Sequence, residues 1–224
     1  MRAYGLVTFQ WSCHTLASHG QKPAHTEWLN RTDVWPNRLF AESLREAIGD
    51  SGPVLTWSHF EGTTLKQIIA DLDRFGHVVP ELVAWMTEVF ENRIVDMHEW
   101  ARRDYYNPGM RGRTSIKVVL DALWKSDGVM RKQFEAWTGM VADESRDPYA
   151  SLPPVEIGGT MQDVHEGTGA MRAYQEMMYG HDKSNPALAE MWSQLLKRYC
   201  ELDTLSMVLI LEHWRRCVGL AAPR

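Results

Sequence analysis

Short stretches with a two-residue hydrophobic period stand near the N-terminus of the chain. Residues 5–16 alternate between polar side chains and a large apolar set from Val7 to Cys13, which is the pattern of a strand with one buried face. The segment HTEWL, residues 25–29, follows a turn that contains Gly and Pro and predicts a second strand. The apolar run GPVLTWS, residues 52–58, predicts a short buried strand.

Longer stretches carry apolar residues three and four positions apart, which is the spacing of amphipathic helices. They are residues 35–50, 60–76, 80–103, 114–124, 169–178 and the stretch from about Pro186 to Trp214. Thr114 or Ser115 is expected to cap the fourth of them. Residues 125–165 are rich in Pro, Gly and acid and predict an irregular excursion. The expected fold is therefore α/β or α+β, a single domain over residues 1–224 whose C-terminal part is mainly helical.

The composition narrows the classes of protein. With 24 Lys and Arg against 29 Asp and Glu, the net charge is −5, so no global cationic field marks a nucleic-acid binder. The three cysteines, Cys13, Cys200 and Cys217, are too scattered for a disulfide framework and fit a reducing compartment. No apolar run reaches the roughly 20 residues of a membrane span. We expect a cytoplasmic protein that does not enter a membrane.

One aspartate stands in an otherwise apolar helical stripe near the C-terminus. The stripe consists of Trp192, Leu196, Tyr199, Asp203, Met207, Ile210 and Trp214. A carboxylate is rarely buried unless something pairs with it. Tyr199 and Asp203 are four residues apart and share a helix face, so Asp203 could bind a divalent cation while the phenol orients a water beside it. The alternative is an ion pair with a neighbouring lysine or arginine.

Two further acids are candidates for chemistry. Glu61 follows a predicted buried strand and opens a helix, a place where catalytic groups of open sheets often lie. The helix dipole alone also favours an acid there, so no function is required. Asp96, in NRIVDMHEW, stands in a helical stripe and is expected to be structural.

The strongest basic cluster is the segment YYNPGMRGRTSIK, which places Arg111, Arg113 and Lys117 around a Gly-rich turn before a helix. Such a loop could hold phosphates, or it could be an ordinary solvated loop. No pair of histidines has H-x-x-x-H spacing, so zinc is not expected. The sequence lacks G-x-x-x-x-G-K-[ST], G-x-S-x-G and G-x-G-x-x-G. Their absence argues against a nucleoside-triphosphate-binding protein, an esterase and a dinucleotide-binding protein.

Several segments together resemble a bacterial domain-of-unknown-function family related to the DEDD exonucleases of the ribonuclease H-like superfamily. In chain order they are FQWSCH, HTEWL, VLTWSHFE, IVDMHEW, YYNPGMRGRTSIKVVLDAL, GAMRAY and RYCELDTLSMV. The resemblance covers nearly the whole chain. It implies a mixed sheet flanked by helices, and four acids that hold two Mg²⁺ or Mn²⁺ ions for phosphodiester hydrolysis.

The resemblance assigns individual residues. Tyr199 and Asp203 match the third motif, Y-x-x-x-D, in which the tyrosine positions the attacking water and the aspartate binds metal. Trp57 and Glu61 stand where the second motif has N-x-x-x-D, so Glu61 would be a metal ligand and Trp57 departs from the pattern. Single-stranded nucleic acid is the implied partner.

The first motif of the family, D-x-E on a central strand, has no counterpart because the chain begins after it. Two of the four acids are then missing, and we expect strand 5–16 to expose an unpaired edge or find another partner. Either the protein starts upstream of Met1 or the chain is a decayed fragment, and in both cases it is expected to cleave nucleic acid weakly or not at all. The alternatives are a non-catalytic binding or scaffold module and an unrelated helical interaction protein.

Overall fold

The computed structural model describes residues 7–149, 152, 155–157, 160–162, 167–180 and 184–220. The described strands are β1 (Gln10–Thr15), β2 (Ala24–Leu29), β3 (Val54–Thr56), β4 (Ile94–Asp96), β5 (Val155–Ile157) and β6 (Thr160–Gln162). The described α-helices are α1 (Asn37–Ile48), α2 (Phe60–Arg74), α3 (Pro80–Glu88), α4 (Met97–Arg103), α5 (Ile116–Ser126), α6 (Gly128–Thr138), α7 (Gly167–Tyr179) and α8 (Pro186–Cys217).

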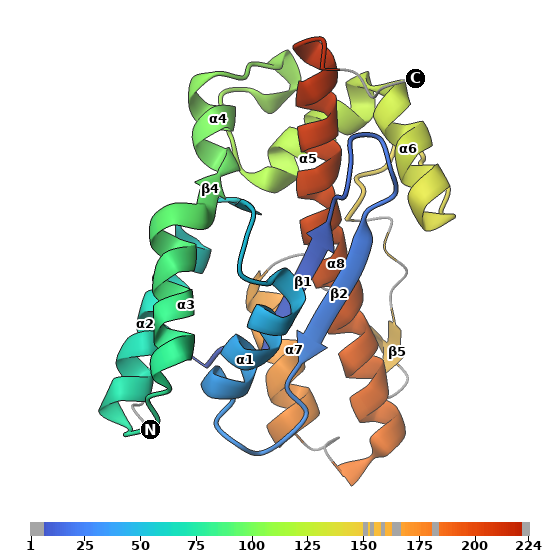
Figure 1. The fold of residues 1–224 in the computed structure, drawn as a ribbon. Helices are drawn as coiled ribbons and strands as arrows, with labels where there is room; N and C mark the ends of the chain where they lie inside the picture. The colour runs from blue at the N-terminus through green and yellow to red at the C-terminus, as the bar shows by residue number, and fades with distance from the viewer. Residues whose placement is uncertain are drawn as a thin grey trace.

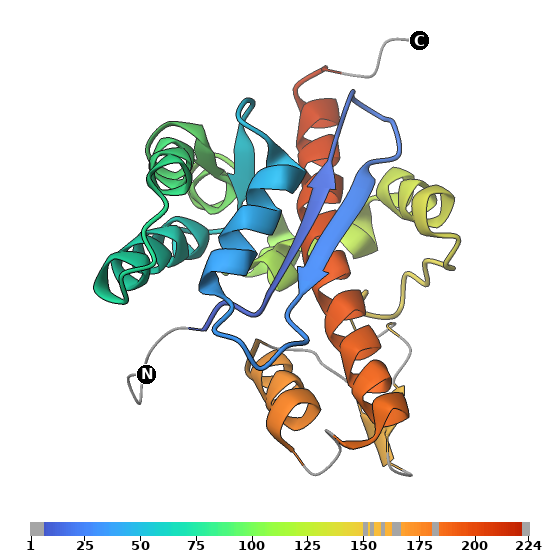
Figure 2. The same ribbon diagram turned by 60° about the horizontal axis from the view of Figure 1, so that its bottom comes forward.

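The long helix α8 runs through the molecule, with α7 beside its first half and the β1–β2 hairpin across it (Figures 1 and 2). Asn185 caps it by accepting hydrogen bonds from the backbone N–H groups of Ala187 and Leu188. Its buried side, which includes Leu196 and Leu209, belongs to the larger of two hydrophobic clusters. Within the described residues, no helix is both long and apolar enough to cross a bilayer.

The β1–β2 hairpin lies between the two hydrophobic clusters. Its strands pair antiparallel from Gln10 opposite Leu29 to Thr15 opposite Ala24. Trp11 and Trp28 pack against the smaller cluster, which α1, α2 and α3 form. The hairpin therefore ties the N-terminal helices to α8.

A parallel pair of three-residue strands, β3 and β4, joins the region before α2 to the region before α4. Residues 80–103 were expected as one helix, and this expectation is wrong at β4. After α3 the chain makes a π-helical turn at Val89–Arg93 and then extends, because Ile94 to Asp96 pair with Val54 to Thr56. This long-range pairing overrides the local helical pattern.

The segment 125–165 was expected to be irregular, and this is wrong for residues 128–138, which form α6. The Asp127 carboxylate caps the helix by accepting from the backbone N–H groups of Val129 and Met130. Met130, Phe134 and Trp137 recur at helical spacing and are buried, which anchors α6 in the larger cluster. The β5–β6 pair also lies within the segment.

The α+β class is confirmed, with most of the described helices after the first strands. In place of one mixed sheet, the described strands form three separate two-stranded sheets. One pair is parallel, β3–β4, and the β1–β2 pair is antiparallel. Within the described residues, β1 pairs with β2 along one edge, and no described strand pairs with its other edge.

A buried arginine fastens the turn between α1 and β3. Arg93 donates to the carbonyl oxygens of Gly49 at 2.7 Å, Gly52 at 2.8 Å, Ser51 at 2.8 Å and Ile48 at 3.1 Å. The guanidinium thus satisfies the carbonyl groups at the C-terminal end of α1, where the helix dipole also favours a cation. Only a planar group with several donors can reach all four acceptors at once.

We predict that Arg93→Met lowers the free energy of unfolding by about 3 kcal/mol, because it removes all four hydrogen bonds that the buried guanidinium makes to this turn. Arg93→Lys should lose less, since an ammonium group replaces some of the donors. Urea denaturation monitored by circular dichroism measures both. The matched control is Arg102→Met, whose exposed pair with Glu99 should matter by less than about 1 kcal/mol. A loss for Arg93→Met no larger than that of the control would contradict the role of this turn.

Candidate functional site

Asp203 lies on α8 in a half-buried position and is held by two tyrosines. The Tyr149 hydroxyl donates a hydrogen bond of 2.6 Å to Asp203 Oδ1. Tyr199, one turn earlier on the same helix, also hydrogen-bonds the carboxylate. Burial raises the pKa of Asp203 above its ordinary value, and the hydrogen bond from Tyr149 and the charge of Lys117 only partly offset this.

Lys117 brings a positive charge to the same place from the first turn of α5. Its ammonium nitrogen lies 4.8 Å from the centre of the Tyr149 ring and 5.1 Å from that of the Tyr199 ring. A cation over an aromatic face is stabilised by the negative side of the ring. Lys117 is therefore the nearby cation expected if Asp203 has an electrostatic partner rather than a metal ion. The hydrogen bonds to Asp203 come from the two tyrosines.

Glu61 enters from a second element, the first turn of α2. The turn before it is strained, because Ser58 has a φ of 108°, a value that L-residues rarely adopt. Thr56 Oγ1 donates to the Ser58 carbonyl oxygen at 3.1 Å, and the Ser58 amide donates to Asp96 Oδ1 at 2.8 Å. These bonds fix the direction in which the chain enters α2 and so the position of Glu61.

Asp96, at the end of β4, has the structural role that the sequence predicts. Its Oδ1 accepts from the backbone N–H of His98 at 2.8 Å, which caps α4, as well as from the amide of Ser58. The stripe in which it stands is a strand end rather than a helix. One carboxylate therefore connects β4, α4 and the turn that leads to Glu61.

Three acids from different elements interact electrostatically. The pKa of Glu61 is raised, first by burial of the carboxyl group and then by the negative charges of Asp96 and Asp203. The Glu61 side chain as a whole is exposed. Water therefore screens these interactions, and they indicate proximity rather than strong coupling. The charges of Asp96 and Asp203 thus both reach Glu61, and a shared metal site at Glu61 and Asp203 stays a prediction.

The predicted basic residues divide into two groups. Lys117 belongs to the acid cluster, whereas Arg111 and Arg113 have exposed side chains in the turn before α5. Arg111 adopts a left-handed backbone conformation with a φ of 50°, next to Gly112 with a φ of 75°. This turn thus carries two exposed cations just before a helix, and among the described residues no hydrogen bond or ion pair joins the two arginines to the carboxylates.

Trp57, which stands where the resemblance expects an asparagine, has a packing role. Its indole N–H donates to the Thr114 carbonyl oxygen at 3.3 Å, and its ring stacks on Trp214 with centroids 6.1 Å apart. The side chain thus connects the end of β3 to α5 and α8. Its ring cannot supply the acceptor oxygen that an asparagine would offer.

Sequence reasoning missed Tyr149 as a site residue. It lies in the part of 125–165 that has no regular structure, where no periodicity points to burial, yet its side chain is only 3% exposed. Only the tertiary fold brings it to Asp203. Within the described residues, no group of three or more His, Cys, Asp or Glu side chains is arranged to hold a metal ion. The site as described can thus offer carboxylate oxygens to a cation but not a full set of ligands.

The comparisons with known proteins give a family without an activity. A family described as a domain of unknown function (DUF2779) matches residues 1–115, just over half of the chain, and the protein belongs to this family. The matched range includes Glu61 and Asp96, whereas Tyr199 and Asp203 lie beyond it. No curated protein and no solved structure matches the chain.

We predict that Asp203→Asn stabilises the protein at neutral pH. The pKa of Asp203 is higher in the folded than in the unfolded chain, so the folded state binds more protons between the two values and its stability falls as the pH rises through that window. Asparagine removes this penalty and still accepts the bond from Tyr149. Urea denaturation should show a gain above the window and none below a pH of about 3, where the unfolded carboxyl is protonated as well.

The control is Asp73→Asn, an exposed position on α2. It should leave the unfolding free energy within about 0.5 kcal/mol of the parent. A loss of stability for Asp203→Asn at pH 7 would contradict a raised pKa for Asp203 and the burial of its carboxyl group as the cause.

Proposed function

We propose that this member of the DUF2779 family is related to the DEDD-type 3′-to-5′ exonucleases and uses Glu61 and Asp203 to hold Mg²⁺ or Mn²⁺ for phosphodiester hydrolysis. The observation that carries the proposal is the proximity of these two acids, which come from α2 and α8 and are far apart in the chain. The resemblance assigns a metal to the same two residues. Their mutual repulsion is the arrangement that a divalent cation relieves.

Carboxylate oxygens are the ligands that Mg²⁺ and Mn²⁺ prefer, so the donor chemistry fits. Bound there, such ions supply an activated water and stabilise the leaving oxygen of the phosphodiester. The residues of this chain hold the surroundings in place. Tyr199 hydrogen-bonds Asp203, and the resemblance assigns this tyrosine the role of orienting the attacking water. Lys117 offers a positive charge to a phosphate beside the carboxylates.

The ligand set of the described residues is incomplete for two ions. We infer that the remaining acids come from a further strand, outside the described residues or supplied by another chain, that joins β1 to β3. A mixed sheet contains both antiparallel and parallel neighbours, and β1–β2 and β3–β4 supply one pair of each kind. Without that strand, the chain is expected to be weakly active or inactive.

Arg111 and Arg113 are proposed as contacts to the phosphate backbone of single-stranded nucleic acid. Both are exposed in the glycine-containing turn that leads into α5, whose N-terminal N–H groups also favour anions. Lys117 lies one turn further along, next to Asp203. A strand that runs from this turn toward the acids would pass all three cations.

A second candidate function is a non-catalytic module that binds nucleic acid or serves as a scaffold. The bond from Tyr149 to Asp203 favours it, because the hydroxyl occupies an oxygen that a metal ion would need. The packing of Trp57 in place of a polar residue points the same way. In this case the acids would be remnants, and only the surface around Arg111 and Arg113 would act.

We predict that the full chain binds Mn²⁺ in a way that depends on both acids. Asp203→Asn and Glu61→Gln should each weaken the binding by about tenfold or more, since each removes a charged ligand. Tyr149→Phe should leave it unchanged or tighten it, because it frees the Asp203 oxygen. The loss of the electron paramagnetic resonance signal of free Mn²⁺ measures the affinity. The matched controls on the same helices are Glu190→Gln on α8 and Asp73→Asn on α2.

Equal Mn²⁺ affinity in the parent and both site variants would contradict the first proposal. A 5′-labelled single-stranded oligonucleotide then separates the two candidates. Metal-dependent shortening from the 3′ end that Asp203→Asn abolishes supports the exonuclease. Binding without cleavage that depends on Arg111 and Arg113, and is indifferent to Asp203 and to metal, supports the non-catalytic module.

A further inference from the structure

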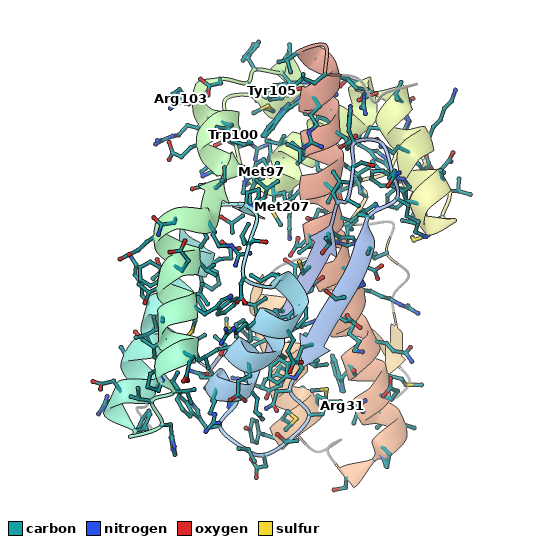
Figure 3. The ribbon with its side chains drawn as sticks, in the orientation of Figure 1. Arg31, Met97, Trp100, Arg103, Tyr105 and Met207 are labelled. Atoms are coloured by element: carbon teal, nitrogen blue, oxygen red, sulfur yellow. The ribbon has the colours of Figure 1, made fainter. Side chains whose placement is uncertain are left out.

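A cysteine, a histidine and an aspartate form a chain of contacts at the C-terminal end of α8. The Asp127 carboxylate oxygen Oδ2 lies 2.7 Å from His213 Nδ1, and His213 Nε2 lies 3.4 Å from Cys217 Sγ. His213 and Cys217 are four residues apart on α8 and share one face of the helix. Tyr105, which lies beside this end of α8 in Figure 3, also reaches His213 Nε2 at 3.1 Å.

The hydrogen-bond pattern fixes which ring nitrogen of His213 carries the proton. Asp127 is ionised at neutral pH: burial would raise its pKa, but the bonds from His213, the amide of Met130 and Arg216 outweigh burial and bring it to about 2. A carboxylate only accepts, so Nδ1 carries the hydrogen and Nε2 presents its lone pair. That lone pair faces the thiol of Cys217 and the hydroxyl of Tyr105.

We propose that Cys217, His213 and Asp127 form a reactive-thiol site that exchanges with low-molecular-weight disulfides. A nucleophile, a base within reach of its proton and a third group that orients the base are the arrangement that activates thiols in general. Cys217 is exposed, so a small disulfide can reach its sulfur. The site lies at the C-terminal end of α8, whereas Tyr199 lies near the middle of the helix, and it does not depend on the metal proposal.

The exchange step balances without an external oxidant. The Cys217 thiol gives its proton to His213 Nε2 while Sγ attacks one sulfur of the disulfide R–S–S–R. The new bond joins Cys217 Sγ to that sulfur, the original S–S bond breaks, and the departing thiolate takes the proton from His213 to become R–SH. Asp127 stays ionised and stabilises the imidazolium that exists during the transfer.

The reactivity of Cys217 can be compared with that of the other two cysteines in the same protein. Cys13 and Cys200 are less exposed than Cys217, and burial raises the pKa of both thiols. Asp127 also has structural roles, because it caps α6 and accepts a hydrogen bond of 2.6 Å from Arg216. If Asp127 had structural roles alone, the reactivity of Cys217 would not depend on His213. The experiment measures this dependence.

The experiment treats the native full chain with dithiodipyridine, a neutral disulfide probe that avoids attraction by nearby arginines. Release of thiopyridone gives the rate, and peptide mass mapping identifies the modified cysteine. Cys217 should react first and about tenfold faster than free glutathione at the same pH. His213→Gln and Asp127→Asn should each slow Cys217 by about tenfold. Asparagine is also a favourable N-cap, so α6 keeps its start in the second variant.

The variant Tyr105→Phe distinguishes a catalytic base at His213 from a residue with a structural role alone. It removes the hydroxyl that competes with the thiol for His213 Nε2, so the rate of Cys217 should rise. The proposal is overturned if Cys217 reacts no faster than glutathione, or if it reacts at the parental rate in both His213→Gln and Asp127→Asn. An unchanged or lower rate in Tyr105→Phe likewise counts against His213 as the base.

Discussion

The burial of α8 along its length is the constraint on which the rest of the structure depends. Leu196, Leu209 and Ile210 have no exposed surface, and α5, α6 and α7 pack against the helix. A helix of 32 residues is one rigid element, so its side chains keep fixed positions relative to one another. The candidate carboxylate at Asp203 and the thiol at Cys217 are both placed by it, and so is the region on which the hairpin rests.

The contact between the hairpin and α8 combines apolar packing with several polar bonds. Ser12 and His14 both hydrogen-bond the Thr204 hydroxyl, at 3.0 and 2.8 Å. Glu212, almost fully buried, accepts from the backbone N–H of Gly20 and contacts His19 and Arg215. Directional bonds of this kind specify one docking position for β1 and β2, whereas apolar packing alone would tolerate several. The position of β1 and β2 on α8 is therefore defined by these bonds.

The sequence predicts the elements whose pattern is long and locally consistent, and it does not predict those that depend on distant partners. The apolar stripe of α8 identifies both the helix and Asp203 as its exception. The three-residue strand β4 forms only because β3 lies beside it, so no local period reveals it. For α6 a signal was present, since Asp127 before Gly128 is a typical N-cap, but the surrounding Pro, Gly and acid obscured it.

Some residues of the candidate site could be identified from the sequence, and others could not. Glu61, Lys117, Tyr199 and Asp203 could be named because they stand in recognisable segments, and the fold brings their charges together. Tyr149 could not be named, because an irregular segment gives no clue to which side chain it buries. The place of Asp96 in the cluster follows from the parallel pairing of β4 with β3, which the sequence does not show. The chemistry of a site can thus be suggested by spacing, but its surroundings are set by long-range packing.

The central claim is that Glu61 and Asp203 share one small volume, and carboxyl titration tests it most directly. Nuclear magnetic resonance of the side-chain carboxyl carbons gives the pKa of Glu61 in the parent and in Asp203→Asn. We expect the pKa of Glu61 to lie above its ordinary value in the parent and to fall when the charge at position 203 is removed. An identical titration of Glu61 in both proteins would show that the two acids are too far apart to serve a common ion.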